Sequence, residues 1–187
     1  MKSVGFKEWS VICEALAHGR QSVIVRKGGI AEGRAGFSFQ HPEFFLFPTW
    51  FHEQLVSVRT TDIAPPEQVA GEIEVRCFAR VDVVRTLTSW ATAERLERFH
   101  ILQPQVVKER FEYKDAPGVH VAFVRAFRLS PAWRLAEEKR YGGCRSWIEL
   151  PELPSRMEMV AVLSDEEHAR RRAEFLAVVG EDVGVMK

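Results

Sequence analysis

Two apolar, strand-like runs on either side of a glycine-rich basic loop are the feature that most constrains this chain. The first run, at residues 22–27, is continuous and β-branched, which is typical of a buried strand. The second run, at residues 44–47, predicts a partner strand. Glycine adopts φ > 0 and lets a ligand approach the backbone closely, so glycines interleaved with cations favour a loop that receives an anion. The alternative is a wide hairpin loop whose cations are only solvated.

The periodicity of the remaining chain predicts strands and helices without a regular βαβ alternation. Residues 72–87 alternate apolar and polar side chains, and residues 119–129 form the cleanest alternating run in the chain. Ser164, followed three residues later by Glu167, is a capping-box pattern that predicts the start of a final helix. These elements favour an α+β fold with a curved, mostly antiparallel sheet and several packed helices. Further expected elements are helices at 6–17, from Pro48, at 88–99 and at 104–113, a linker at 60–70, a basic loop at 130–145 and a strand at 147–150.

Composition limits the classes of protein that the chain can represent. At 187 residues and 46% hydrophobic content, the chain is expected to form a single domain, residues 1–187, with a sub-boundary near 60–70. Its charges balance at 26 against 26, so a basic face has to be local, as in the Arg- and Lys-rich segment 125–145. Three cysteines without CxxC spacing favour a reduced, cytoplasmic setting. No run approaches the ~18 apolar residues of a membrane span, so no membrane association is expected.

Short motifs along the chain resemble a known family. They are GFKEW at 5–9, EAL at 14–16, RKGGI at 26–30, FPTxxHE at 47–53 and GCxSW at 143–147. In these motifs the chain is similar to a bacterial family of uncharacterised proteins, a named domain of unknown function, over nearly its whole length. The resemblance implies a restriction-modification context and a restriction-endonuclease-like partner, because relatives carry such a domain as a fusion. That fused domain is not visible in this chain, and the resemblance supplies no catalytic residues.

An enzymatic interpretation of the basic loop competes with a binding role. A metal-dependent nuclease needs acidic ligands and a lysine at a strand end, as in a D…ExK arrangement. Lys27 occupies such a strand end, but Val25 stands where the acidic residue two positions earlier would be. The remaining enzymatic alternative is a small phosphate-substrate or metal-dependent hydrolase in which Lys27, Glu32, His52 and Glu53 converge. Whether the chain is an enzyme stays open on these residues.

Metal and thiol chemistry have less support in the sequence. His52 and Glu53, joined by His41 or His100, have side chains that suit zinc or manganese, but their spacing matches no known ligand motif. We therefore predict no metal and no cofactor, and interpret His52 as a helix-surface histidine that bonds a neighbouring loop. Cys144 has basic neighbours that would favour a thiolate. Without a His partner it is predicted to be a buried structural thiol.

Nucleic-acid binding would use the basic and aromatic residues together. Arginine and lysine neutralise phosphates and aromatic rings stack on bases, so the loop cations and segment 125–145 are expected to share one cleft. Curved-sheet domains that resemble the PUA or ASCH class, with a barrel-like portion, would hold such a cleft. We expect a module that binds DNA or RNA in restriction-modification or defence; a structural partner-binding domain is a further option. The predicted site residues are Arg26, Lys27, Gly28, Gly29, Arg34, Trp50, His52, Arg140, Tyr141 and Arg145, with Trp133 as an additional stacking candidate.

Overall fold

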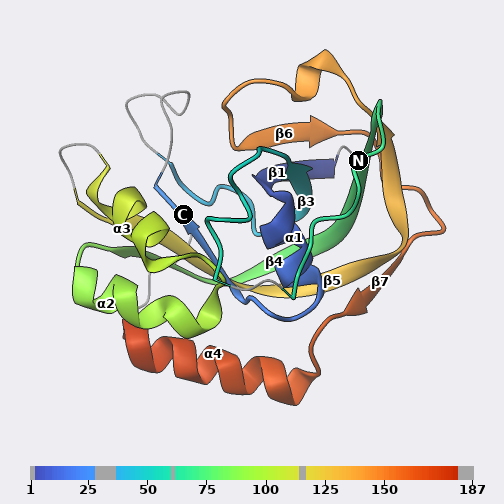
Figure 1. Cartoon of the computed structure of the whole chain (residues 1–187). Coiled ribbons are helices and arrows are strands. Elements are labelled where there is room, and N and C mark those ends of the chain that lie inside the picture. The colour runs from blue at the N-terminus through green and yellow to red at the C-terminus, as the bar shows by residue number, and fades with distance from the viewer. Residues whose placement is uncertain (1–2, 28–36, 60–61, 114–116, 181–187) are drawn as a thin grey trace.

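One mixed, seven-stranded sheet organises the protein (Figure 1). The computed structural model describes residues 3–27, 37–59, 62–113 and 117–180. The strand order is β2-β5-β4-β3-β1-β6, and β7 also pairs with β5. Among the described pairs, β1 and β3 run parallel and the others run antiparallel. The strands are β1 Ser3–Trp9, β2 Val23–Arg26, β3 Glu43–Thr49, β4 Glu72–Leu87, β5 Val119–Ala136, β6 Trp147–Leu150 and β7 Glu158–Ala161.

The long antiparallel pair of β4 and β5 gives the sheet its curvature. The pairing register shifts twice along this pair, between Val75 and Cys77 and between Val81 and Val83. Such bulges bend a strand and increase its local twist. The bend separates two hydrophobic clusters. The larger cluster lies among α1, β2, the first half of β5 and the helices that follow β4 in the chain. The smaller cluster lies among β3, β6, the first half of β4 and the second half of β5.

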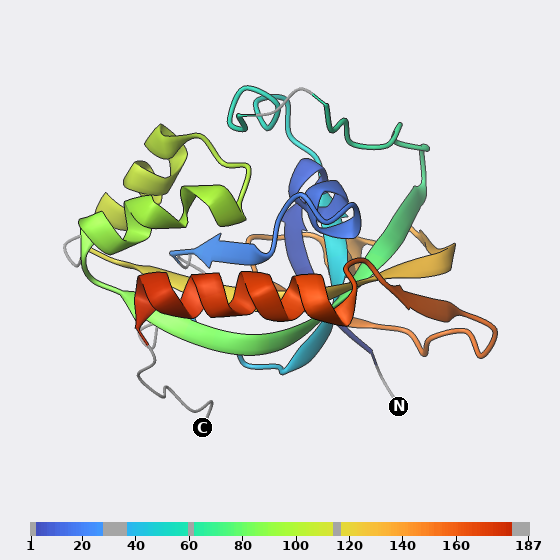
Figure 2. The ribbon, with the colours of Figure 1, turned by 90° about the horizontal axis from the view of Figure 1, so that it is seen from below.

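The helices differ in burial and in where they lie on the sheet. The short helix α1 is buried along its whole length, and its N-terminus is satisfied by Gln54, whose Oε1 accepts the Ser10 hydroxyl at 3.0 Å and the Val11 N–H at 3.2 Å. The longest, α4, lies across β4 and β5 when the molecule is viewed from below (Figure 2). No described helix is long and apolar enough to cross a membrane. The helices are α1 Ser10–Ala17, α2 Trp90–Glu94, α3 Pro104–Glu112 and α4 Asp165–Val179, with 3₁₀ helices η2 Arg95–Phe99 and η3 Lys139–Tyr141.

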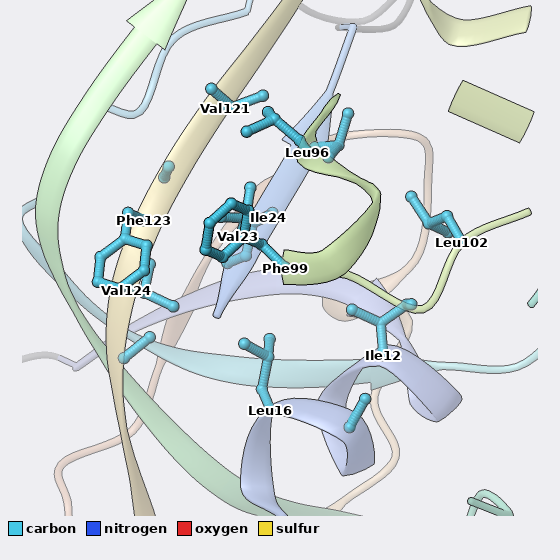
Figure 3. Packing of buried hydrophobic residues seen from close by; sticks show 14 of the residues in the cluster. Ile12, Leu16, Val23, Ile24, Leu96, Phe99, Leu102, Val121, Phe123 and Val124 are labelled. Carbon is cyan, nitrogen blue, oxygen red and sulfur yellow. The ribbon is translucent and has the colours of Figure 1, made fainter. Parts of the chain in front are cut away.

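The larger cluster joins α1 to the sheet and to η2. Figure 3 shows Leu16 of α1 below β2 and β5, and Phe99 of η2 beside Ile24. Phe123 of β5 and Phe175 of α4 are fully buried, and their ring centroids are 5.2 Å apart. Burying an aromatic side chain of this size contributes roughly 1.5–3 kcal/mol. The cluster therefore holds α4 and η2 on the same face of the sheet.

Most of the predicted elements are confirmed. β4 occupies 72–87 as expected, and β2, β6 and α3 lie where their patterns placed them. The final helix begins at Asp165, and the Ser164 hydroxyl oxygen accepts the Glu167 N–H at 3.2 Å, as the capping pattern predicts. The α+β class and the curved, mostly antiparallel sheet are also confirmed.

Four local predictions are wrong. The expected helix at 6–17 is a strand up to Trp9 and a helix only from Ser10. No helix begins at Pro48, because β3 continues through it to Thr49. The run at 44–47 is a strand, but β3 pairs with β1 and β4, whereas β2 pairs with β5. The expected loop at 130–145 is in part the continuation of β5.

Candidate functional site

A hollow forms where three segments that are distant in the sequence meet. Arg26 and Lys27 at the end of β2, Phe51 after β3, and Cys144 and Ser146 before β6 all line it. Its volume is about 490 Å³, which is within the range of roughly 300–1,000 Å³ typical of ligand pockets. Parts of all three segments therefore share one concave surface, which we call the cationic pocket. Its other described lining residues are Trp9, Ser57, Val106, Glu109, Arg110 and Tyr113.

A buried carboxylate stands behind this pocket. Glu8 of β1 is 2% exposed, and its Oε1 accepts the backbone N–H of Trp9 at 2.8 Å. Its Oε2 lies 3.8 Å from the guanidinium of Arg26. A buried charge is costly unless it is paired and hydrogen-bonded. Glu8 and Arg26 therefore stabilise each other as ions within the protein.

Arg26 is held in place by three kinds of contact. Its guanidinium donates to the Lys7 carbonyl at 3.1 Å and to the Ser146 hydroxyl at 3.2 Å. The same group lies 4.9 Å from the ring centroid of Phe6, within the range of a cation–π interaction. With the ion pair to Glu8, these contacts leave the side chain little rotational freedom. Arg26 is thus a fixed positive charge at the wall of the pocket.

Arg110 places a second guanidinium in the pocket wall from helix α3. It donates to the Val25 carbonyl at 2.7 Å and lies 4.6 Å from the ring centroid of Trp9. Burial lowers the pKa of Arg110 to about 10, with Glu8 opposing that change and Arg26 adding to it. The guanidinium is still charged at neutral pH, so the pocket holds at least two arginine cations.

Two lysines near the pocket are bound to backbone carbonyls. Lys27 Nζ donates to the carbonyls of Gly118 at 2.8 Å and Phe111 at 3.3 Å, which ties the end of α3 to the start of β5. Lys7 Nζ donates to the Gly143 carbonyl at 2.9 Å, and burial lowers the pKa of Lys7 below its usual value. These contacts orient both ammonium groups and connect three loops around the pocket.

Aromatic side chains form another part of the wall. The rings of Trp9 and Phe51 meet edge to face with centroids 4.8 Å apart. Phe51 is 37% exposed and Tyr113 is 45% exposed, and both line the pocket. A hollow that combines exposed aromatic faces with fixed cations suits a planar, negatively charged ligand, since the ring stacks and the charge is neutralised.

Half of the predicted site residues belong to the end of β2 or to the residues that follow it in the chain. Arg26 and Lys27 line the pocket. Gly28, Gly29 and Arg34 lie outside the described residues, so the structure says nothing of them.

The other five predicted residues lie outside the lining of the cationic pocket. Trp50 and Tyr141 line a second hollow, of about 560 Å³, beside β3, and Tyr141 is only 4% exposed. His52 is exposed in the turn after β3 and lines neither hollow. Arg140 and Arg145 are also exposed. These placements do not test binding, and all ten residues stay predictions.

Two expectations for individual side chains are wrong. Cys144 is exposed and lines the cationic pocket, whereas a buried structural thiol was expected; Cys13 and Cys77 are the buried cysteines. Trp133 is 3% exposed and packs against Phe45, with ring centroids 5.1 Å apart, so its face is closed to a base. Within the described residues no three His, Cys, Asp or Glu side chains are grouped as a metal ion would need.

The sequence interpretation missed several residues of the pocket. Glu8 and Trp9 were placed in a helix, where neither would have been directed to the loop after β2. Arg110 and Tyr113 were recognised only as part of a helical pattern. The available signal was the GFKEW motif itself, in which a Glu adjoins a Trp.

The fold and the pocket define an α+β protein with a curved sheet and a cationic, aromatic-lined hollow at one side of it. The chain belongs to the family described as Domain of unknown function (DUF1802), whose model matches residues 5–174. This match includes all described lining residues of the cationic pocket. It confirms the resemblance to a family of uncharacterised proteins. No curated protein matches the chain.

Solved structures with a similar fold come from Zymomonas mobilis. The crystal structure of ASCH from this organism is 13% identical, with a TM-score of 0.45, and the match covers 92% of this chain and 94% of that one. A mutant of ZmASCH with serine replaced by alanine is also 13% identical, with a TM-score of 0.47 and coverage of 92% and 96%. At these scores the likeness carries no argument about function.

Proposed function

We propose that the protein is a nucleic-acid-binding module that takes an unpaired nucleotide of DNA or RNA into the cationic pocket. The observation that carries the proposal is the combination of Phe51 and Tyr113, both exposed aromatics, with the fixed guanidiniums of Arg26 and Arg110. A base would stack on an aromatic face, and its phosphate would lie near the cations. Stacking of this kind tolerates any base, so little sequence preference is expected.

An unpaired strand fits the pocket better than a duplex. A base in a duplex has both faces covered by its neighbours, whereas a base in a single strand can leave the stack and enter a hollow. The volume of about 490 Å³ is of the order of one drug-sized ligand. We therefore expect stronger binding to single-stranded oligonucleotides than to the same sequence as a duplex.

The alternative is a small hydrolase that acts on a phosphate-containing substrate. Its predicted residues do not gather in the described part of the pocket: Lys27 lines it, His52 and Glu53 do not, and Glu32 lies outside the described residues. The restriction-modification context and the endonuclease-like partner stay implications of the family resemblance. The binding proposal stands without either of them.

The test is fluorescence anisotropy with labelled single-stranded DNA and RNA of mixed sequence. Phe51→Ala removes one stacking face, so it should cost about 1–3 kcal/mol of binding free energy, or roughly 5- to 150-fold in Kd. Leu55→Ala is the matched control, because Leu55 lies in the same turn segment, is 52% exposed and does not line the pocket. Equal Kd values for these two variants would refute the assignment of the pocket.

Salt dependence tests the cationic side of the proposal. Each phosphate contact with a single strand contributes about 0.7 to the slope of log K against log salt concentration. Lys27→Ala should reduce that slope by one such contact. Absence of binding to any oligonucleotide at low salt would show that the protein is not a nucleic-acid-binding module.

A further inference from the structure

A third hollow, which Arg59 helps to line, has five arginines among its lining residues. Its volume is about 470 Å³, and it lies between α4, η2 and the turn that follows α1. Five guanidiniums from four separate segments line it together with two carboxylates, Glu97 and Glu174. We call it the arginine hollow. The arginines are Arg20, Arg59, Arg98, Arg170 and Arg171.

Backbone carbonyls hold two of these guanidiniums in place. Arg171 donates to the Gly19 carbonyl at 2.7 Å, which joins α4 to the turn after α1. Arg59 donates to the Leu102 carbonyl at 3.0 Å and also to the carbonyl of His100. The described lining of the hollow therefore comes from α4, η2, the turn after α1 and Arg59, joined by these hydrogen bonds.

Two of the guanidinium heads, those of Arg98 and Arg20, are exposed and only partly occupied. The side chain of Arg98 is 55% exposed; its nearest contacts with Glu174 are long, at 3.8 Å to the carboxylate and 3.4 Å to the carbonyl. Arg20 pairs with Asp62, whereas Arg170 is bound at all three of its nitrogens by Glu167 and Glu174. A guanidinium has five N–H donors, so one carboxylate does not exhaust it. Donors therefore remain for an oxyanion that enters the hollow.

His100 supplies an independent observation at the base of the hollow. It lines the hollow, is 3% exposed, and neither of its ring nitrogens has a hydrogen-bond partner among the described residues. Buried polar groups are normally bonded, and an unpaired imidazole next to arginines is a group that an anion would stabilise. Nothing in the cationic pocket explains this side chain.

We propose that the arginine hollow binds a phosphate group. The planar fork of arginine matches phosphate oxygens in a bidentate manner, and several forks converge here from different elements. The second hollow, beside β3, has Glu137 and Glu138 in its lining but only Lys139 as a cation among its described lining residues, so it is less suited to an anion. Two sources have the required chemistry: a free phosphate compound, or a backbone phosphate of the strand that enters the cationic pocket.

The two hollows lie close enough for one strand to reach both. Val58 is buried and bridges to Leu102, while Ser57 lines the cationic pocket and Arg59 lines the arginine hollow. Two residues of chain span at most about 7 Å, so the two hollows adjoin at this segment. The idea that one nucleic-acid strand occupies both hollows rests on the proposed function. Phosphate binding in the arginine hollow does not.

The experiment is an NMR titration of the full chain with inorganic phosphate, followed through the imidazole signals of His100. Arg98→Ala should weaken phosphate binding about tenfold, the loss of one charge-assisted contact. Arg80→Ala is the matched control, because Arg80 has the same 55% exposure, one carboxylate partner in Glu43 and one aromatic ring, Phe127. Arg98→Lys retains the charge without the fork and should give an intermediate affinity.

The outcomes separate the two proposals. Phosphate affinity that is equal in Arg98→Ala and Arg80→Ala, or phosphate that leaves the His100 signals unchanged, overturns the arginine hollow as a site. If Arg98→Ala also weakens oligonucleotide binding and lowers its salt slope, the source is the strand. If phosphate binds in the hollow but oligonucleotide binding is unaffected by Arg98→Ala, the source is a free phosphate compound. If Phe51→Ala abolishes oligonucleotide binding and Arg98→Ala changes the binding of neither ligand, the proposed function is supported and the arginine hollow is refuted as a phosphate site.

Discussion

Acidification should destabilise the protein through His100. This side chain is 3% exposed, and Arg59 and Arg110 are its charged neighbours. Burial first, and then these two cations, lower the pKa of His100 from 6.5 to about 3. Below pH 6.5 the unfolded chain therefore binds a proton at His100 that the folded chain does not bind. Stability contributed by the neutral imidazole is complete above pH 6.5 and decreases as the pH falls towards 3.

The size of the effect follows from the two pKa values. In the window where only the unfolded state is protonated, the free energy of unfolding changes by about 1.36 kcal/mol per pH unit. Between pH 6.5 and pH 4, where the folded imidazole stays mostly neutral, the expected loss is about 3 kcal/mol. Because a domain of this kind has a total stability of roughly 5–15 kcal/mol, the loss is a large part of it.

Urea unfolding at a series of pH values measures this loss. Carboxylates also titrate between pH 6.5 and 4, so the informative quantity is the difference between the wild-type protein and His100→Gln. The difference in free energy of unfolding between the two proteins should change by about 3 kcal/mol between pH 6.5 and pH 4, whatever the stability of the variant at neutral pH. His52→Gln serves as the control, since His52 is exposed. Parallel pH profiles for the wild type and His100→Gln would refute the reasoning.

Two further predictions concern residues that hold the pocket and α4. Glu8→Gln removes the charge that faces Arg26 and should lower the free energy of unfolding by about 2–4 kcal/mol. This is somewhat less than for a fully buried pair, because the Arg26 side chain is 20% exposed. Urea unfolding measures the loss, with Glu43→Gln as an exposed control, and a loss below about 1 kcal/mol would contradict the stabilising role of the ion pair. Ser164→Ala removes the cap that accepts the Glu167 N–H and should cost about 1 kcal/mol. Thermal unfolding detects this loss, and an unchanged Tm would show that the cap is unimportant.

The sequence predicted those helices and strands whose patterns lie within their own residues. The alternation at 72–87 gave β4 its bounds, and the Pro104 and Ser164 signals gave the starts of α3 and α4. β1 failed because residues 5–8 are all buried, which leaves no alternation to read, and α1 follows immediately with the same apolar character. A short, fully buried strand cannot be distinguished from a buried helix by periodicity alone.

Strand pairing was beyond the sequence for a different reason. β2 and β3 are close in the chain, and consecutive strands usually pair. Here β2 pairs with β5, and β3 pairs with β1 and β4, so these two strands belong to separate parts of the sheet. This arrangement places Arg26 beside β1, where Glu8 is its partner. The loop cations could be predicted from composition, but their buried carboxylate could not.

The buried carboxylate also determines how the pocket would bind. Glu8 offsets much of the charge of Arg26 and Arg110, and Glu109 lies in the same lining, so the excess positive charge is small. The cations are held in position before a ligand arrives, which lowers the ordering cost of binding. With a small excess charge, phosphate contacts supply a modest share of the affinity and stacking on Phe51 and Tyr113 supplies more. Loss of Phe51 should therefore weaken binding by a similar factor at every salt concentration, whereas loss of Lys27 should matter most at low salt.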